Sequence, residues 1–226
     1  MDHRFFAIFD MDGTLVDSMG FWRGLCREYL HRRGITDPSA ALLERIKTMT
    51  LHETAALFIE TFHLGGTPEE IAAAINGLME AHYRRDVPLK DGVLPCLERF
   101  QAAGIPMCVA SATAPALLEV CLRRLGVRKY FAFLLSCEEV GCGKSRPDVY
   151  LTAARRMGAA PEKTIVFEDA LSAAKTARAA GFRVAGVQDS AENCQRELKA
   201  VSDWYLERLD DPAFLDALLP PSPPSL

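Results

Sequence analysis

The stretch FFAIFDMDGTL, residues 5–15, decides the fold of this chain. Five apolar residues in a row that end at Asp10 predict a strand buried on both faces, as in a parallel sheet. Asp10 and Asp12 are two positions apart, so along an extended backbone their carboxylates point to the same side. The stretch therefore predicts a carboxylate pair at the carboxyl end of a buried strand.

Further apolar runs extend this pattern along the chain. Short runs at 106–110, 164–167 and 182–187 also end in polar residues, and 131–135 and 204–206 read as two more strands. Between them lie helical patterns at 94–103, 116–125, 147–157 and 171–180, each followed by a glycine that suits a left-handed helix C-cap. Alternating strands and helices predict right-handed βαβ units. We expect an α/β fold, a doubly wound parallel sheet with a Rossmann-like core.

The alternation is interrupted between the first two strands. Helical patterns at 21–33, 40–49, 53–63 and 68–85 have no convincing strand among them, and Thr67 with Glu70 predicts a capping box at one helix start. We therefore expect a smaller all-α cap domain at residues 18–90, inserted into a catalytic core of residues 1–17 and 91–226. The proline-rich residues 220–226 predict a disordered tail.

Composition restricts the class of function. The chain has 226 residues and a formal net charge of -4, which does not favour nucleic acid or anionic lipid as the main partner. Its seven cysteines lack a C-x-x-C pair and indicate free thiols. Asp10 interrupts the N-terminal apolar run too early for a secretory signal or a membrane span. We expect a cytoplasmic monomer or weak dimer that acts on a small molecule.

The polar strand ends predict the chemistry. Ligands of open parallel sheets bind outside the carboxyl ends of the strands, so Asp10, Ser111 and Asp169 should meet in one crevice. One carboxylate of the Asp10–Asp12 pair can attack phosphorus while the other exchanges protons with the leaving group and with water. Clustered acids facing a phosphate need a cation, and Mg²⁺ suits oxygen ligands. Asp169 is the obvious further ligand, with Glu168 beside it.

Phosphate binding has its own candidates. Lys144 offers a point charge to the phosphate and to Asp10. Ser111 offers a hydroxyl, and backbone N–H groups such as that of Ala112 lie next to it at the strand end. Substrate selection is expected from the loop between two cap helices, where Thr48, Thr50 and His52 are the candidates.

Four motifs in order connect this chain to a known family. They are the stretch from Asp10 to Ser18, Ser111-Ala112-Thr113, Lys144 within Gly-Lys-Ser-Arg-Pro-Asp, and Phe167-Glu168-Asp169. With them the sequence resembles the haloacid dehalogenase superfamily, in the branch of β-phosphoglucomutase and phosphoglycolate-type phosphatases. A helical cap after the first motif is what that branch has.

The resemblance implies roles for five residues of these motifs. Asp10 would be the nucleophile, Asp12 the acid/base and a metal ligand through its backbone carbonyl, and Asp169 a metal ligand. Ser111 and Lys144 would bind phosphate. The expected function is a Mg²⁺-dependent phosphatase of small phosphate monoesters, with sugar phosphates as the expected substrates, that works through an aspartyl-phosphate.

Other functions share parts of this pattern. A sugar-phosphate mutase would use the same first motif and hand the phosphoryl group to another hydroxyl. A non-catalytic binding or regulatory module is a further alternative, against which the intact acids argue. A dehalogenase needs no acid at position 12, and a P-type pump is excluded by size and by the absence of spans.

Overall fold

The computed structural model describes residues 5–46, 49–190 and 194–219. The chain divides into two compact units, of which the larger comprises Met1–Met19 and Val87–Leu226 and the smaller Gly20–Asp86. The expected tail at residues 220–226 lies outside the described residues.

The larger unit includes both chain segments that lead to the smaller one. Val16 pairs with Leu89, and the amide of Asp17 donates to the carbonyl of Pro88 at 3.0 Å. These bonds tie the two segments to each other within the larger unit. The division therefore falls a few residues inside the expected cap limits of 18 and 90.

A six-stranded parallel sheet in the order β3-β2-β1-β4-β5-β6 forms the centre of the larger unit. Its strands are β1 Phe6–Phe9, β2 Met107–Ser111, β3 Leu134–Ser136, β4 Thr164–Glu168, β5 Arg183–Val187 and β6 Trp204–Leu206. Every residue of β1, β2 and β4 is buried. The predicted α/β fold is confirmed, because strands buried on both faces are what a doubly wound sheet requires.

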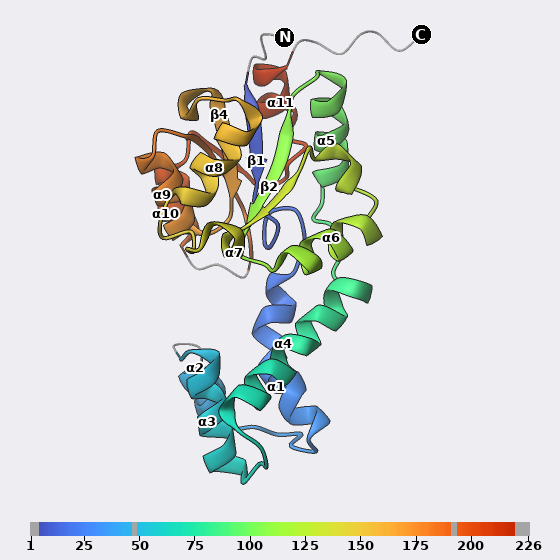
Figure 1. The fold of residues 1–226 in the computed structure, drawn as a ribbon, viewed down its shortest axis with the longest axis vertical. Helices are drawn as coiled ribbons and strands as arrows, with labels where there is room; N and C mark the ends of the chain where they lie inside the picture. Colours follow the sequence, from blue (N-terminus) through green and yellow to red (C-terminus); the bar gives the residue numbers. More distant parts are fainter. Residues whose placement is uncertain (1–4, 47–48, 191–193, 220–226) are drawn as a thin grey trace. The chain divides into compact units, whose positions relative to one another are not determined.

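Helices cover the two faces of this sheet (Figure 1). The helices are α5 Val93–Ala102, α6 Pro115–Arg124, α7 Cys137–Val140, α8 Asp148–Met157, α9 Leu171–Ala179, α10 Gln195–Val201 and α11 Pro212–Leu218, with 3₁₀ turns η1 Arg128–Tyr130 and η2 Pro161–Lys163. In Figure 1, α8 and α9 lie on one side of the strands and α5 and α6 on the other. The strand order reverses between β1 and β4, so their carboxyl ends form the topological switch point where such sheets bind ligands.

Aromatic packing holds β1 and β4 together. Phe9 and Phe167 are register partners, and their rings stack with centroids 4.3 Å apart. Side chains alternate between faces along a strand, so Ile8 and Val166 lie on the opposite face, where they pack with Tyr150 of α8. The next residues on that second face, two positions further along each strand, are Asp10 and Glu168.

Among the described residues of the smaller unit, all regular elements are helices. Its elements are α1 Met19–Arg32, α2 Ala40–Ile46, α3 Leu51–Phe62 and α4 Pro68–Arg85. The predicted capping box is confirmed, since Thr67 Oγ1 accepts from the Glu70 amide and Glu70 accepts from the Thr67 amide. No helix of the described residues is both long and apolar enough to cross a membrane.

Candidate active site

A tight turn follows β1 and presents the first motif. The amides of Leu15 and Val16 both donate to the Met11 carbonyl, and the Gly13 amide donates to the Val16 carbonyl. Gly13 has φ +74, and a Cβ placed on it would lie 2.1 Å from Asp169 Oδ2. Only glycine allows both the left-handed backbone and this close approach to the carboxylate.

Three buried acids meet where β1 and β4 end. Carboxylate oxygens of Asp10, Glu168 and Asp169 lie within 4.8 Å of one another. Their relative exposures are only 7%, 0% and 4%, so water screens their mutual repulsion poorly. A hard divalent cation fits this set of oxygen ligands.

Lys144, in the loop before α8, supplies positive charge to this cluster. Its Nζ lies 2.5 Å from Glu168 Oε1 and 2.6 Å from Asp10 Oδ1, the second contact being an ion pair without hydrogen-bond alignment. Tyr150 donates a second hydrogen bond to Glu168 Oε1 at 2.6 Å. Among the described residues, the buried atoms Asp10 Oδ1 and Glu168 Oε2 have no hydrogen-bond partner. Asp10 Oδ1 already faces the Lys144 ammonium, so Glu168 Oε2 is the atom that a bound cation would satisfy.

The electrostatics of the cluster follow from its burial. Burial raises the pKa of Asp10 well above its ordinary value, Lys144 opposes this, and Glu168 and Asp169 raise the pKa further. Burial and the charge of Glu168 raise the pKa of Asp169 to about 7. Burial would lower the pKa of Lys144, but Asp10 and Glu168 hold it above its ordinary range. The cluster combines three acids with one cationic side chain, Lys144, so the site favours an added positive charge.

Asp12 stands apart from the three-acid cluster. Its Oδ1 accepts from Ser18 Oγ and its Oδ2 from Thr113 Oγ1, both at 2.6 Å. The Thr113 hydroxyl thus ties a carboxylate of the first motif to the second motif, and the Ser18 hydroxyl holds the same carboxylate from within the first motif. Ser18 and Thr113 both lie within the quoted motifs, but sequence reasoning gave neither a role.

Ser111 lies at the end of the strand that pairs with β1. It is the last residue of β2, is buried, and accepts a hydrogen bond from the Thr113 amide at 3.2 Å. Ala112, which follows it, is exposed. Because β2 and β4 flank β1, the sheet brings Ser111, Asp10 and Asp169 to one rim.

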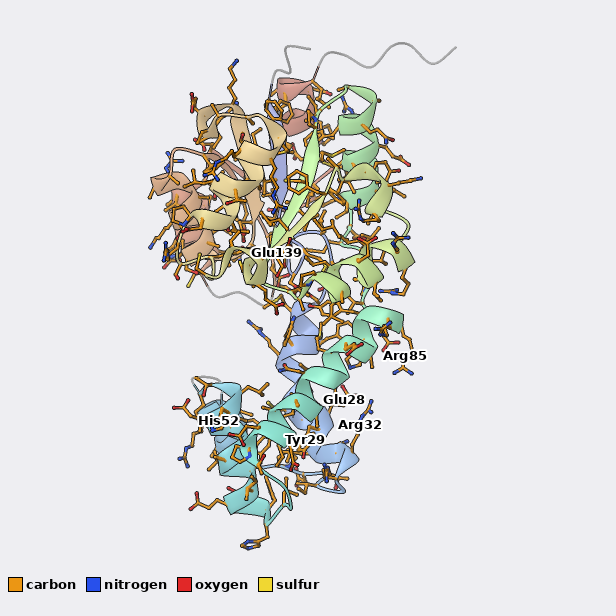
Figure 2. All side chains as sticks on the ribbon, in the orientation of Figure 1. Glu28, Tyr29, Arg32, His52, Arg85 and Glu139 are labelled. Carbon is orange, nitrogen blue, oxygen red and sulfur yellow. The ribbon has the colours of Figure 1, made fainter. Side chains whose placement is uncertain are left out.

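The candidates for substrate selection lie in the smaller unit. Thr48 is outside the described residues. Thr50 is the N-cap of α3, in a capping box with Glu53. His52 is exposed on α3, with its Nδ1 3.6 Å from Glu69 Oε1, and is labelled in Figure 2. A role in substrate selection stays a prediction for all three.

Comparison with known proteins agrees with this geometry. Residues 7–181 match the family model for haloacid dehalogenase-like hydrolases. This span includes the whole parallel sheet except its last two strands and all four motifs. The chain belongs to the haloacid dehalogenase-like hydrolase family, which confirms the resemblance seen in its motifs.

Individual relatives within the family are moderately similar. The chain is 28% identical to the phosphorylated carbohydrates phosphatase of Thermotoga maritima over 86% of this chain and 90% of that protein. It is 32% identical to fructose-1-phosphate phosphatase YqaB of Escherichia coli over 80% and 95%, respectively. The crystal structure of a provisionally assigned β-phosphoglucomutase from Thermotoga maritima matches with a TM-score of 0.79 and 26% identity, covering 94% of this chain and 97% of that one.

Proposed function

We propose that this protein is a Mg²⁺-dependent phosphatase of small phosphate monoesters, with sugar phosphates as the substrate class. The main support is the cluster of three buried acids beside Lys144 at the switch point of the sheet. The names of the relatives from Thermotoga maritima and Escherichia coli support the substrate class, since both are phosphatases of phosphorylated carbohydrates.

Asp10 is the proposed nucleophile of the first half-reaction. A carboxylate oxygen of Asp10 attacks phosphorus, an acyl-phosphate bond forms, and the ester P–O bond to the sugar breaks. Asp12, the acid/base in this scheme, gives its proton to the departing alkoxide, which leaves as the free alcohol. Proton transfer of this kind contributes about 100- to 10,000-fold in rate.

Water completes the second half-reaction. Asp12, now ionised, takes a proton from water while the oxygen attacks the phosphorus of the aspartyl-phosphate. The acyl P–O bond breaks, inorganic phosphate leaves, and the Asp10 carboxylate is restored. The hydrogen bonds from Ser18 and Thr113 suit Asp12 in its ionised state, because a carboxylate accepts on both oxygens.

Asp10, Glu168 and Asp169 would hold the Mg²⁺ ion. When bound, the cation neutralises charge on the phosphoryl oxygens and lowers the repulsion between the substrate and the acids. Lys144 neutralises Asp10 and Glu168, and Ser111 would donate its hydroxyl to a phosphoryl oxygen.

The deciding experiment compares two isosteric variants. Asp10→Asn should abolish phosphate release from a panel of sugar phosphates with Mg²⁺, whereas Asp17→Asn, at an exposed carboxylate, should retain it. Quenching wild-type turnover of a ³²P-labelled substrate in acid should trap labelled protein whose label hydroxylamine removes. Full activity in Asp10→Asn, or no turnover by the wild type on the whole panel, would reject the proposal.

The same assay separates the phosphatase from a mutase. A mutase would convert a hexose 1-phosphate to the 6-phosphate and release little inorganic phosphate. We expect stoichiometric phosphate release and no isomer, because water is the acceptor in the proposed second step.

A further inference from the structure

Lys90 is a second buried cation beside the site, on the segment that returns from the smaller unit. Its Nζ donates to the Gly13 carbonyl at 2.6 Å, to the Gln188 carbonyl at 2.5 Å and to Asp189 Oδ2 at 3.0 Å. The side chain is only 15% exposed. Three acceptors match the three donors of an ammonium group, so Lys90 is fully bonded within the fold.

The acceptors of Lys90 belong to two loops that flank the loop of Asp169. Gly13 lies in the turn after β1, and Gln188 and Asp189 follow β5 directly. β4, which leads to Asp169, lies between β1 and β5 in the sheet. One side chain thus connects the loops on both sides of a proposed metal ligand.

The hydrogen bond from Lys90 to Gly13 is made to a turn that lies directly against Asp169. The Gly13 backbone is so close to Asp169 that a Cβ there would lie 2.1 Å from Oδ2. Thr14, the next residue, has its Oγ1 3.4 Å from Asp169 Oδ1. The backbone amide of Lys90 also donates to the Leu15 carbonyl at 3.0 Å. Lys90 therefore holds the turn against Asp169 through both its main chain and its side chain.

Lys90 also neutralises a further acid of this rim. Asp189 is 2% exposed, and its charge is near enough to raise the pKa of Asp169. A buried carboxylate without a paired cation is strongly unfavourable. With Lys90 in place, the field of Asp189 at the three-acid cluster is reduced.

We propose that Lys90 is a positioning residue of the phosphoryl-transfer site, which fixes the Gly13 turn against Asp169 and so shapes the cation site. The proposal rests on the proposed function for its catalytic consequence. The proposal also has two structural consequences, which concern the order of the Gly13 turn and the affinity of the cation site for Mg²⁺. Both are measurable without turnover.

The test uses Lys90→Met, which keeps the length of the side chain and removes the ammonium. Because this variant removes the Lys90 ammonium from the buried Asp189, the double variant Lys90→Met/Asp189→Asn is made as well. Lys175→Met, at an exposed lysine of α9, is the control. Calorimetric titration with MgCl₂ measures metal affinity, and amide hydrogen exchange measures the order of residues 13–16.

We expect the double variant to bind Mg²⁺ about tenfold more weakly than the wild type, in the range found for residues that orient metal ligands. Its amides at Leu15 and Val16 should exchange faster, and kcat should fall with little change in KM. Lys175→Met should match the wild type in all four quantities.

The opposing result is specific. If the double variant has wild-type Mg²⁺ affinity and wild-type exchange at residues 13–16, Lys90 only pairs with Asp189 and the proposal is wrong. Failure of the proposed function would instead show as Asp10→Asn retaining activity, an outcome independent of both measurements on Lys90.

Discussion

The phenol of Tyr150 donates a hydrogen bond to Glu168 Oε1 at 2.6 Å, from the helix that covers one face of the sheet. Glu168 lies two residues beyond Val166 on β4 and so points to the face on which Val166 packs with Tyr150. Tyr150 is fully buried, and its ring also meets Phe182 edge-on at 6.2 Å. With Lys144 it occupies one oxygen of Glu168 and leaves Oε2 for a cation.

Tyr150→Phe should weaken the binding of Mg²⁺ while it preserves the packing of the ring. Loss of one hydrogen bond to Glu168 frees its carboxylate to rotate, so we expect the Mg²⁺ concentration for half-maximal activity to rise about tenfold. The free energy of unfolding should fall by about 1 to 2 kcal/mol. Mg²⁺ titration of phosphate release and urea unfolding measure the two effects.

Tyr205→Phe is the matched control for this change. Tyr205 donates a 2.7 Å hydrogen bond to Gln195, and neither residue belongs to the three-acid cluster. Loss of this hydrogen bond should lower the free energy of unfolding to a similar extent as in Tyr150→Phe. It should leave the Mg²⁺ dependence of phosphate release unchanged. Equal Mg²⁺ curves for Tyr150→Phe and the wild type would show that Glu168 does not depend on the phenol.

The sheet and the acid cluster could be predicted because their signals are local. Each main strand is a continuous apolar run, and its polar end needs only the parallel topology to bring Asp10, Ser111 and Asp169 to one rim. Tyr150 and Lys90 could not be found in this way. Tyr150 lies inside an amphipathic helix, and Lys90 lies in a linker without periodicity, so their contacts depend on which elements the fold brings together.

The helices that sequence reasoning missed are short. α7 spans Cys137–Val140 and has no room for an apolar period. A signal was present, because Ser136 and Glu139 have the spacing of a capping box, which the structure contains. At α11, Asp211 caps a helix that begins with Pro212, a second readable start signal. For these short helices, the capping residues at the helix start are therefore more informative than the periodicity of apolar residues.

Gly13→Ala should abolish activity through a clash with Asp169. A methyl group at Gly13 would lie 2.1 Å from Asp169 Oδ2, in addition to the cost of a positive φ. We expect loss of measurable phosphate release and of Mg²⁺ binding by calorimetry. The control is Gly104→Ala, where φ is +69 but nothing lies within 4 Å of the added methyl group. That variant should lose about 1 to 2 kcal/mol of stability and keep its activity, since it has the backbone strain alone.

Thr50 has a structural role that must be separated from its predicted role in substrate selection. Its Oγ1 accepts from the Glu53 amide, and its own amide donates to Glu53 Oε2. Thr50→Ala should therefore cost about 1 kcal/mol through loss of the cap. Thr50→Ser keeps the cap, so a change of KM in this variant would have to come from the lost methyl group.

Thr67→Ala serves as the control, because Thr67 caps α4 with the same pair of hydrogen bonds. If Thr50 contributes to substrate selection, KM for sugar phosphates should change in Thr50→Ala and stay constant in Thr67→Ala, at similar losses of stability. Equal KM values in both variants would leave Thr50 as a helix cap only.

His82 connects two acids within the smaller unit. Its Nε2 lies 2.7 Å from Glu28 Oε2 and its Nδ1 lies 2.8 Å from Asp86 Oδ2, so a doubly protonated ring can donate to both. Glu28 lies on α1 and is labelled in Figure 2. Burial would lower the pKa of His82, but the bonds to Glu28 and Asp86 raise it above the ordinary value of 6.5. Burial also opposes the ionised form of Glu28, whose pKa is nevertheless lowered by His82 and Arg32.

The stabilisation by His82 should depend on pH in one direction. A pKa raised in the folded state means that the folded form binds the proton more tightly, so the contribution is fully present below pH 6.5. It is lost as pH rises through the higher pKa of the folded state.

Amide exchange of residues 20–86 should therefore accelerate in His82→Gln relative to the wild type most strongly near pH 6, and the difference should shrink at about pH 9. A difference between His82→Gln and the wild type that stays constant across this range would mean that His82 contributes by packing against Phe21, whose ring centroid lies 4.7 Å away, and not through its charge.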